Sequence, residues 1–129
     1  MKAIMVAIGS RPWMRIWRQN TGSVEVIKKG KPVGVFHAGP PKGASDISGI
    51  VGSLVPNDPN SGFRLEIETK AEKTADREHQ ITWRQMIFDM GGVPVQVRYD
   101  EGLTMKENVS AAVNVIDAAI DWRRRRGVT

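Results

Sequence analysis

Three charged residues in the middle of the chain have types and spacing that could support chemistry at a single site. Asp46 precedes a run of small and apolar residues, and Glu68 and Lys70 follow later, two positions apart. Side chains two positions apart in a strand point to the same face, one pleat from each other. Two carboxylates that share a site repel each other unless a cation or a shared proton neutralises them. The residue types therefore predict a cation site with a lysine beside it.

The predicted cation is Mg²⁺ or Mn²⁺, because hard carboxylate and carbonyl oxygens select these ions. Such a metal polarises a phosphoryl oxygen and lowers the pKa of a bound water, and a nearby lysine can orient or deprotonate that water. This set of groups is suited to hydrolysis of a phosphodiester bond. The alternative is an ordinary strand face whose charges are solvated.

Two neighbouring strands would position these groups. Phe63, Leu65 and Ile67 alternate with charged residues, which predicts a strand over 63–70 with one apolar face. A second strand is expected from Ile47 to about residue 55, joined to the first by a loop of turn-forming residues. If the two strands are antiparallel, Asp46 falls close to Glu68 and Lys70.

The other elements follow from periodicity, turn residues and capping signals. We expect a helix over 1–9, a strand over 13–18, a turn at 19–22, a hairpin of strands 24–27 and 33–36, a loop over 37–43, a helix from 74 or 76 to 90, a strand over 93–99, and a final helix that opens with a capping box at 104–107.

Composition narrows the class of protein. The length of 129 residues suits one domain, and the chain has no cysteine and only two histidines, which excludes disulfides and thiolate metal sites. No stretch is long enough for a membrane span, and the short apolar run near the N-terminus lacks a cleavage site, so we expect an intracellular protein. The first 45 residues carry eight Lys or Arg and one acid, which fits a surface that grips a polyanion.

Several polar residues are candidates for contacts with DNA. They are Arg15, Arg18, Lys28, Lys29, Lys31, Lys42 and Ser45. The lysines of 28–31 form the predicted tip of the hairpin, where the alternative role is protection of an edge strand. Arg123 to Arg126 end the last helix, where four arginines are also favourable partners of the helix dipole.

Five segments, in order and at matching spacings, resemble a known family. They are Arg18-Gln19-Asn20-Thr21-Gly22, Ser45-Asp46-Ile47-Ser48-Gly49, Ile67-Glu68-Thr69-Lys70, Gln80 and Gly91-Gly92. They are similar to the Arg-Asn-Asn-x-Gly, Ser-Asp-Ile-x-Gly, Ile-Glu-Val-Lys, helix glutamine and closing Gly-Gly of the virus-type replication-repair nuclease (VRR-NUC) domain. The similarity is to the short, stand-alone phage form of this branch of the PD-(D/E)xK nuclease superfamily, and it spans nearly the whole chain.

The resemblance implies one VRR-NUC nuclease domain over 1–129, with an α/β, restriction-endonuclease-like αβββαβα core in which helices flank a mixed central sheet. It implies a metal-dependent endodeoxyribonuclease that acts as a homodimer on four-way (Holliday) junctions, a DNA-repair type of phage or prophage protein in the bacterial cytoplasm. The alternatives are a nuclease of the same fold that acts on flaps or duplex DNA, a catalytically inactive DNA-binding module, and a structural phage component.

The resemblance also suggests a role for each site residue. Asp46 and Glu68, with the carbonyl of Thr69, would bind Mg²⁺ or Mn²⁺. Lys70 would position and activate water or stabilise the phosphate, and Gln80 would hold Lys70 or the water.

The chain departs from the family pattern at two points. Residues 1–12 contain no acid, whereas the family often carries a metal-binding Glu on its N-terminal helix. Glu66 is an additional acid on the active face, and we expect it to be solvated. The alternative is a residue that binds a second metal ion or faces the DNA.

Overall fold

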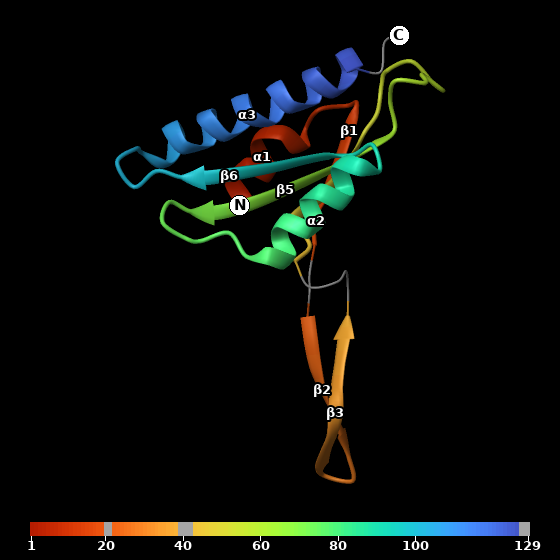
Figure 1. Ribbon diagram of the computed structural model, residues 1–129, viewed down its shortest axis with the longest axis vertical. Helices are drawn as coiled ribbons and strands as arrows, with labels where there is room; N and C mark the ends of the chain where they lie inside the picture. The colour runs from red at the N-terminus through yellow and green to blue at the C-terminus, as the bar shows by residue number, and fades with distance from the viewer. Residues whose placement is uncertain (20–21, 39–42, 127–129) are drawn as a thin grey trace.

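A computed structural model describes residues 1–19, 22–38 and 43–126 (Figure 1). The helices are α1 (Lys2–Gly9), α2 (Glu78–Asp89) and α3 (Met105–Arg126), and the strands are β1 (Met14–Arg18), β2 (Gly22–Lys28), β3 (Lys31–Ala38), β4 (Ile47–Val51), β5 (Phe63–Ala71) and β6 (Val93–Tyr99). β1, β4, β5 and β6 form a four-stranded sheet in the order β1-β4-β5-β6, while β2 and β3 form a separate two-stranded sheet. The predicted α/β class, with helices flanking a mixed sheet, is confirmed.

The four-stranded sheet is antiparallel on one side and parallel on the other. β4 pairs antiparallel with both β1 and β5, whereas β5 pairs parallel with β6. Parallel neighbours need a crossover connection, and α2 supplies it between β5 and β6. Without the β2–β3 hairpin, the element order is helix, three strands, helix, strand and helix.

The two faces of β5 are chemically different. Its apolar side chains join the main core with residues of α1 and α3, a cluster that includes Ile4, Ile8, Leu65, Ile67, Ile116 and Ile120. The opposite face carries Glu66, Glu68 and Lys70 and is covered by α2. The period of two along β5 therefore separates an apolar face from a charged one, as the sequence predicts.

The predicted hairpin is confirmed, and Figure 1 shows that it extends away from the rest of the molecule. Lys29 and Gly30 at its tip both have positive φ, 53° and 75°, which is the geometry of a two-residue type I′ turn. Among the described elements, β2 and β3 contact each other and no other helix or strand. Strands of this length give the arm a reach of roughly 25 Å.

β4 is shorter than expected, because its neighbours stop pairing with it at Val51. Beyond that point, the main-chain N–H of Gly52 donates to Trp13 O at 2.7 Å. The N–H of Gly62 returns to Val51 O at 2.6 Å. The expected continuation to residue 55 is therefore wrong, and the chain turns away from the sheet.

α2 begins at Glu78, later than the expected 74 or 76. The preceding segment has its carbonyls engaged by side chains, because Lys70 Nζ donates to Ala75 O at 3.0 Å. Arg98 Nη1 donates to the carbonyls of Ala71, Glu72 and Thr74. Residues 72–77 accordingly form a turn and an irregular segment, and these side-chain hydrogen bonds stabilise that conformation in place of a helix.

α3 opens as the sequence predicts. Thr104 Oγ1 accepts from Glu107 N at 3.2 Å, and Glu107 Oε1 accepts from Thr104 N at 3.1 Å, which is a capping box. These hydrogen bonds hold the pKa of Glu107 below its ordinary value. Across the described ranges, no helix has both the length and the apolar character needed to cross a membrane.

The close contact between β4 and β1 yields a stability prediction. A Cβ at Gly49 would lie 2.6 Å from Arg15 O and 2.7 Å from Ile16 Cγ2, so Gly49→Ala forces the two strands apart. We expect a loss of about 1–3 kcal/mol in the free energy of unfolding. In thermal denaturation followed by circular dichroism, this corresponds to a fall in Tm of roughly 4 °C per kcal/mol.

Gly34→Ala is the matched control, because a Cβ at Gly34 in β3 has no atom within 4 Å. Its free energy of unfolding should stay within about 0.5 kcal/mol of the wild-type value. Equal Tm values for the two variants would contradict the assignment of Gly49 as a close-packing position.

Candidate active site

β5 and the residue that precedes β4 bring together the three residues singled out from the sequence. Ile47 lies opposite Ile67 in the antiparallel pair, and continuing this register by one residue sets Asp46 opposite Glu68. Directly opposed residues of antiparallel strands have Cβ atoms about 4.5–5.5 Å apart. Lys70 lies one pleat further along β5, on the same face as Glu68. Both acids and the lysine therefore lie at the same end of the sheet.

Asp46 is held by hydrogen bonds to its carboxylate on one side and to its carbonyl on the other. Its Oδ2 accepts hydrogen bonds from Thr69 N at 2.8 Å and from Thr69 Oγ1 at 3.0 Å. Its carbonyl accepts from Gln19 N at 2.9 Å, at the end of β1. The loop that leads to it packs on α2, because Gly43 has φ 97° and a Cβ there would lie 2.5 Å from His79 O. The position of Asp46 is thus fixed by three elements.

Glu68 is 3 % exposed and points toward α2. Its Oε2 accepts from Arg84 Nη1 at 2.8 Å and from Gln96 Nε2 at 3.3 Å. A buried carboxylate needs a counter-charge, and Arg84 provides one. One oxygen of this carboxylate is therefore already engaged within the chain.

Lys70 is 7 % exposed and is oriented by oxygen acceptors. Its Nζ donates to Gln80 Oε1 at 2.6 Å and to Ala75 O at 3.0 Å, and it lies 3.8 Å from Asp76 Oδ1. An ammonium group has three hydrogens. Two hydrogen bonds thus leave one hydrogen for a water or a phosphate oxygen. The structure places Gln80 directly on Lys70.

Asp76, Arg84 and Gln96 also belong to this cluster, and sequence reasoning missed all three. Arg84 makes a bidentate pair with Asp76, with Nη1 3.0 Å from Oδ1 and Nη2 on Oδ2. Gln96 Nε2 lies 3.4 Å from Asp76 Oδ1. The hydrogen bond from Arg84 lowers the pKa of Asp76, and the same bond raises the pKa of Arg84. Arg84 follows Gln80 by four residues, so helical spacing was a signal that could have found it.

Glu66 is fully buried, so the expectation that it is solvated is wrong. Arg64 Nε donates to its Oε1 at 2.8 Å, and Ser48 Oγ and Gln19 Nε2 donate to its Oε2 at 2.9 and 3.1 Å. Gln19 also holds the carbonyl of Asp46 through its main chain. Glu66 therefore supports the strand end that carries Asp46, and both of its carboxylate oxygens are engaged within the chain.

The candidate DNA contacts fall in different places. Arg15 and Arg18 are exposed on β1, and Arg18 pairs with Ile47, next to Asp46. The three lysines of the hairpin tip, Lys28, Lys29 and Lys31, are also exposed.

The other two proposed contacts are Ser45, which is buried, and Lys42, which lies outside the described residues. Ser45 is only 3 % exposed, so it packs inside the molecule. A buried side chain is poorly placed for a surface contact to DNA. Lys42 lies outside the described residues, as do Asn20 and Thr21 of the first matched segment.

The donor set suits a hard divalent cation. Asp46 Oδ1 and Glu68 Oε1 accept no hydrogen bond from any of the described residues, so each acid keeps one oxygen for a ligand. Carboxylate oxygens are the ligands that Mg²⁺ and Mn²⁺ prefer. Within residues 1–19, 22–38 and 43–126, no group of three or more His, Cys, Asp or Glu is placed to hold a metal ion. The ligand set expected from the sequence has only two acids, Asp46 and Glu68, together with the carbonyl of Thr69.

Comparison of the chain with models of known protein families, with curated proteins and with solved structures finds no match.

Proposed function

We propose that this protein is a Mg²⁺- or Mn²⁺-dependent endodeoxyribonuclease of the PD-(D/E)xK type that hydrolyses phosphodiester bonds in structured DNA. One observation carries the proposal. Extension of the β4–β5 register sets Asp46 opposite Glu68, and Gln80 holds Lys70 one pleat away. Each acid keeps one oxygen that accepts no hydrogen bond from the described residues. The VRR-NUC resemblance adds the four-way junction as the preferred substrate.

In this proposal the site residues divide the chemistry between them. Asp46 and Glu68, with the carbonyl of Thr69, would hold the metal ion, which when bound polarises the phosphate and acidifies a water. The remaining hydrogen of Lys70 Nζ would orient the attacking water or stabilise the charge that develops on the phosphate. Gln80 and Ala75 O fix the direction of that hydrogen.

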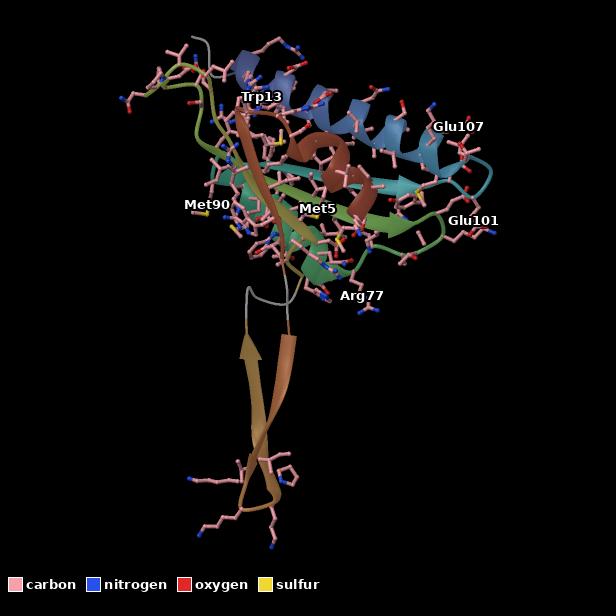
Figure 2. All side chains as sticks on the ribbon, turned by 180° about the vertical axis from the view of Figure 1, so that it is seen from behind. Met5, Trp13, Arg77, Met90, Glu101 and Glu107 are labelled. Atoms are coloured by element: carbon pink, nitrogen blue, oxygen red, sulfur yellow. The ribbon has the colours of Figure 1, made fainter. Side chains whose placement is uncertain are left out.

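The β2–β3 hairpin supports a nucleic-acid substrate. It leaves the sheet after Arg18 and returns shortly before Asp46, so its base lies at the same end of the sheet as the acids. Figure 2 shows Arg77, directly before α2, on the side of the body from which the hairpin extends. The lysines at the tip of the β2–β3 hairpin are suited to contact the DNA backbone away from the cleaved bond.

Cleavage tests the assignment of the catalytic groups. Asp46→Ala and Lys70→Ala should each reduce metal-dependent cleavage of a labelled four-way junction by roughly 10²–10³-fold. Asp46→Ala removes a proposed ligand of the metal ion, and Lys70→Ala removes the group that acts on the water or the phosphate. DNA binding measured by fluorescence anisotropy should remain. Chelation of the metal should abolish cleavage by the wild-type protein.

Lys73→Ala is the matched control, since Lys73 is exposed three residues beyond Lys70. Flap and linear duplex substrates run in parallel identify the preferred DNA structure. Unchanged cleavage in both Asp46→Ala and Lys70→Ala would refute the catalytic assignment. DNA binding without cleavage in any metal would instead favour an inactive binding module.

The lysine tip is tested by the salt dependence of DNA binding. The triple variant Lys28→Gln/Lys29→Gln/Lys31→Gln should weaken DNA binding and flatten the plot of log affinity against log salt concentration. The expected loss of slope is up to roughly 0.9 for each lysine that neutralises a phosphate. Mn²⁺ affinity should be unchanged.

The control for this variant carries the same loss of charge on other exposed surfaces, as Lys2→Gln/Lys73→Gln/Lys106→Gln. If both triple variants lose the same slope, the hairpin is not a specific DNA contact. Its lysines would then serve only to protect an edge strand.

A homodimer completes the proposal. The described part of the chain carries one such site, and symmetric cleavage of two strands needs two sites related by a two-fold axis. Size-exclusion chromatography with light scattering should give about twice the chain mass of 14.3 kDa. A strictly monomeric protein that cuts a junction on both strands would contradict the dimer.

A further inference from the structure

Arg84 reaches from α2 to two acids, only one of which belongs to the proposed metal site. Its Nη1 lies 2.8 Å from Glu68 Oε2 and 3.0 Å from Asp76 Oδ1, and its Nη2 contacts Asp76 Oδ2. The pair with Asp76 is bidentate, whereas Glu68 receives a single hydrogen bond. Bidentate pairs are the stronger and the more directional of the two. Arg84 therefore has one firm partner and one weaker partner.

The weaker partner is the acid that a metal ion would also use. Glu68 is 3 % exposed, so its charge requires compensation when no metal is bound. Arg84 supplies that compensation within the chain. A divalent ion on Oε1 of Glu68 would share one carboxylate with the guanidinium on Oε2, and like charges at this distance repel.

Asp76 gives Arg84 a place to remain when it leaves Glu68. The two hydrogen bonds from Arg84 to Asp76 do not involve Glu68, so they can persist without it. Asp76 is partly exposed, with 24 % of its side chain accessible. Lys70 Nζ is 3.8 Å from the same carboxylate, and Gln96 donates to both acids. The charges around Arg84 thus stay paired after the exchange.

We infer that Arg84 neutralises Glu68 when no metal is bound, and that it releases Glu68 to the divalent ion while it stays bound to Asp76. This inference rests on the proposed metal-dependent function. Arg84 and Asp76 are positioning residues in it. Arg84 competes with the metal for Glu68, and Asp76 draws Arg84 away, so the two residues set the metal affinity in opposite directions.

A purely structural ion pair makes different predictions. If Arg84 only fastens α2 to the sheet, its removal lowers stability and leaves metal affinity unchanged or weaker. The sign of the change in affinity therefore separates the two roles.

The test is a double-mutant cycle with Mn²⁺ alone as the ligand, measured on the intact chain by isothermal titration calorimetry. Arg84→Gln should raise the affinity for Mn²⁺ by about tenfold. This is the lower end of the change in metal affinity that is typical when a residue contacting a metal ligand is replaced. Asp76→Asn should lower it by a similar factor, because Arg84 then has only Glu68. In the Arg84→Gln background, Asp76→Asn should have little further effect, which shows that Asp76 acts through Arg84.

Arg125→Gln is the matched control, because Arg125 is an exposed arginine near the end of α3. It should leave the affinity unchanged, and circular dichroism should show that every variant is folded. If Arg84→Gln does not fold, Arg84→Lys replaces it. The lysine keeps a charge but lacks the bidentate fork, so it should raise the affinity by a smaller factor.

The outcomes separate this inference from the proposed function. Mn²⁺ binding by the wild type with no gain in Arg84→Gln, or in Arg84→Lys where that replaces it, overturns the role of Arg84 and leaves the nuclease proposal standing. Absence of Mn²⁺ binding in the wild type and in every variant overturns the metal site itself. Binding that is seen only after Arg84 is replaced supports the exchange.

Discussion

Three ionisable side chains of β5 are buried on one face of the sheet, and much of the structure serves to compensate them. Glu66, Glu68 and Lys70 are 0, 3 and 7 % exposed. Burying a charge costs several kcal/mol unless it is paired and hydrogen-bonded. The partners come from all around the strand: Arg64 on β5, Ser48 on β4, Gln19 after β1, Arg84 and Gln80 on α2, Gln96 on β6, and Ala75 O. The position of each of these elements is thus tied to the charges of one strand.

This constraint explains why the two faces of the sheet are held in different ways. α1 and α3 pack on the sheet through an apolar core, whose burial supplies most of the stability. α2 contributes a single buried apolar residue, Ile87, and is fastened mainly by the ion pairs of Arg84 and the hydrogen bond of Gln80. Its late start belongs to the same network, since Lys70 and Arg98 hydrogen-bond to carbonyls of the irregular segment before Glu78 and stabilise that conformation.

The sequence predicts the features that depend on local residue pattern. It does not predict which elements pack over each face of the sheet. Alternation along 63–70 gives β5, its two faces and the shared face of Glu68 and Lys70, and the turn residues of 56–62 give the antiparallel return that sets Asp46 opposite Glu68. Alternation does not say what covers a face, so the burial of Glu66 under its partners was not predictable from it. Asp76 lies outside any regular element, where no period indicates a direction. The composition of the hairpin tip gives its turn, but the separation of the arm from the body depends on contacts that no local pattern encodes.

The buried charges favour a chemical role over a structural one. Replacing a buried ion pair by apolar residues of similar volume is often neutral or stabilising by about 1–4 kcal/mol, so a scaffold alone has no need of this network. Perturbed and closely paired ionisable groups concentrate at functional sites for the same reason. Here the pairing is also incomplete in a particular way, since Asp46 and Glu68 each keep one carboxylate oxygen, and Lys70 one hydrogen, that no described residue satisfies. Those groups lie at the end of the sheet where the basic hairpin begins and returns, so in the proposed function the cation ligands and the lysines that bind a polyanion would extend from the same end of the sheet.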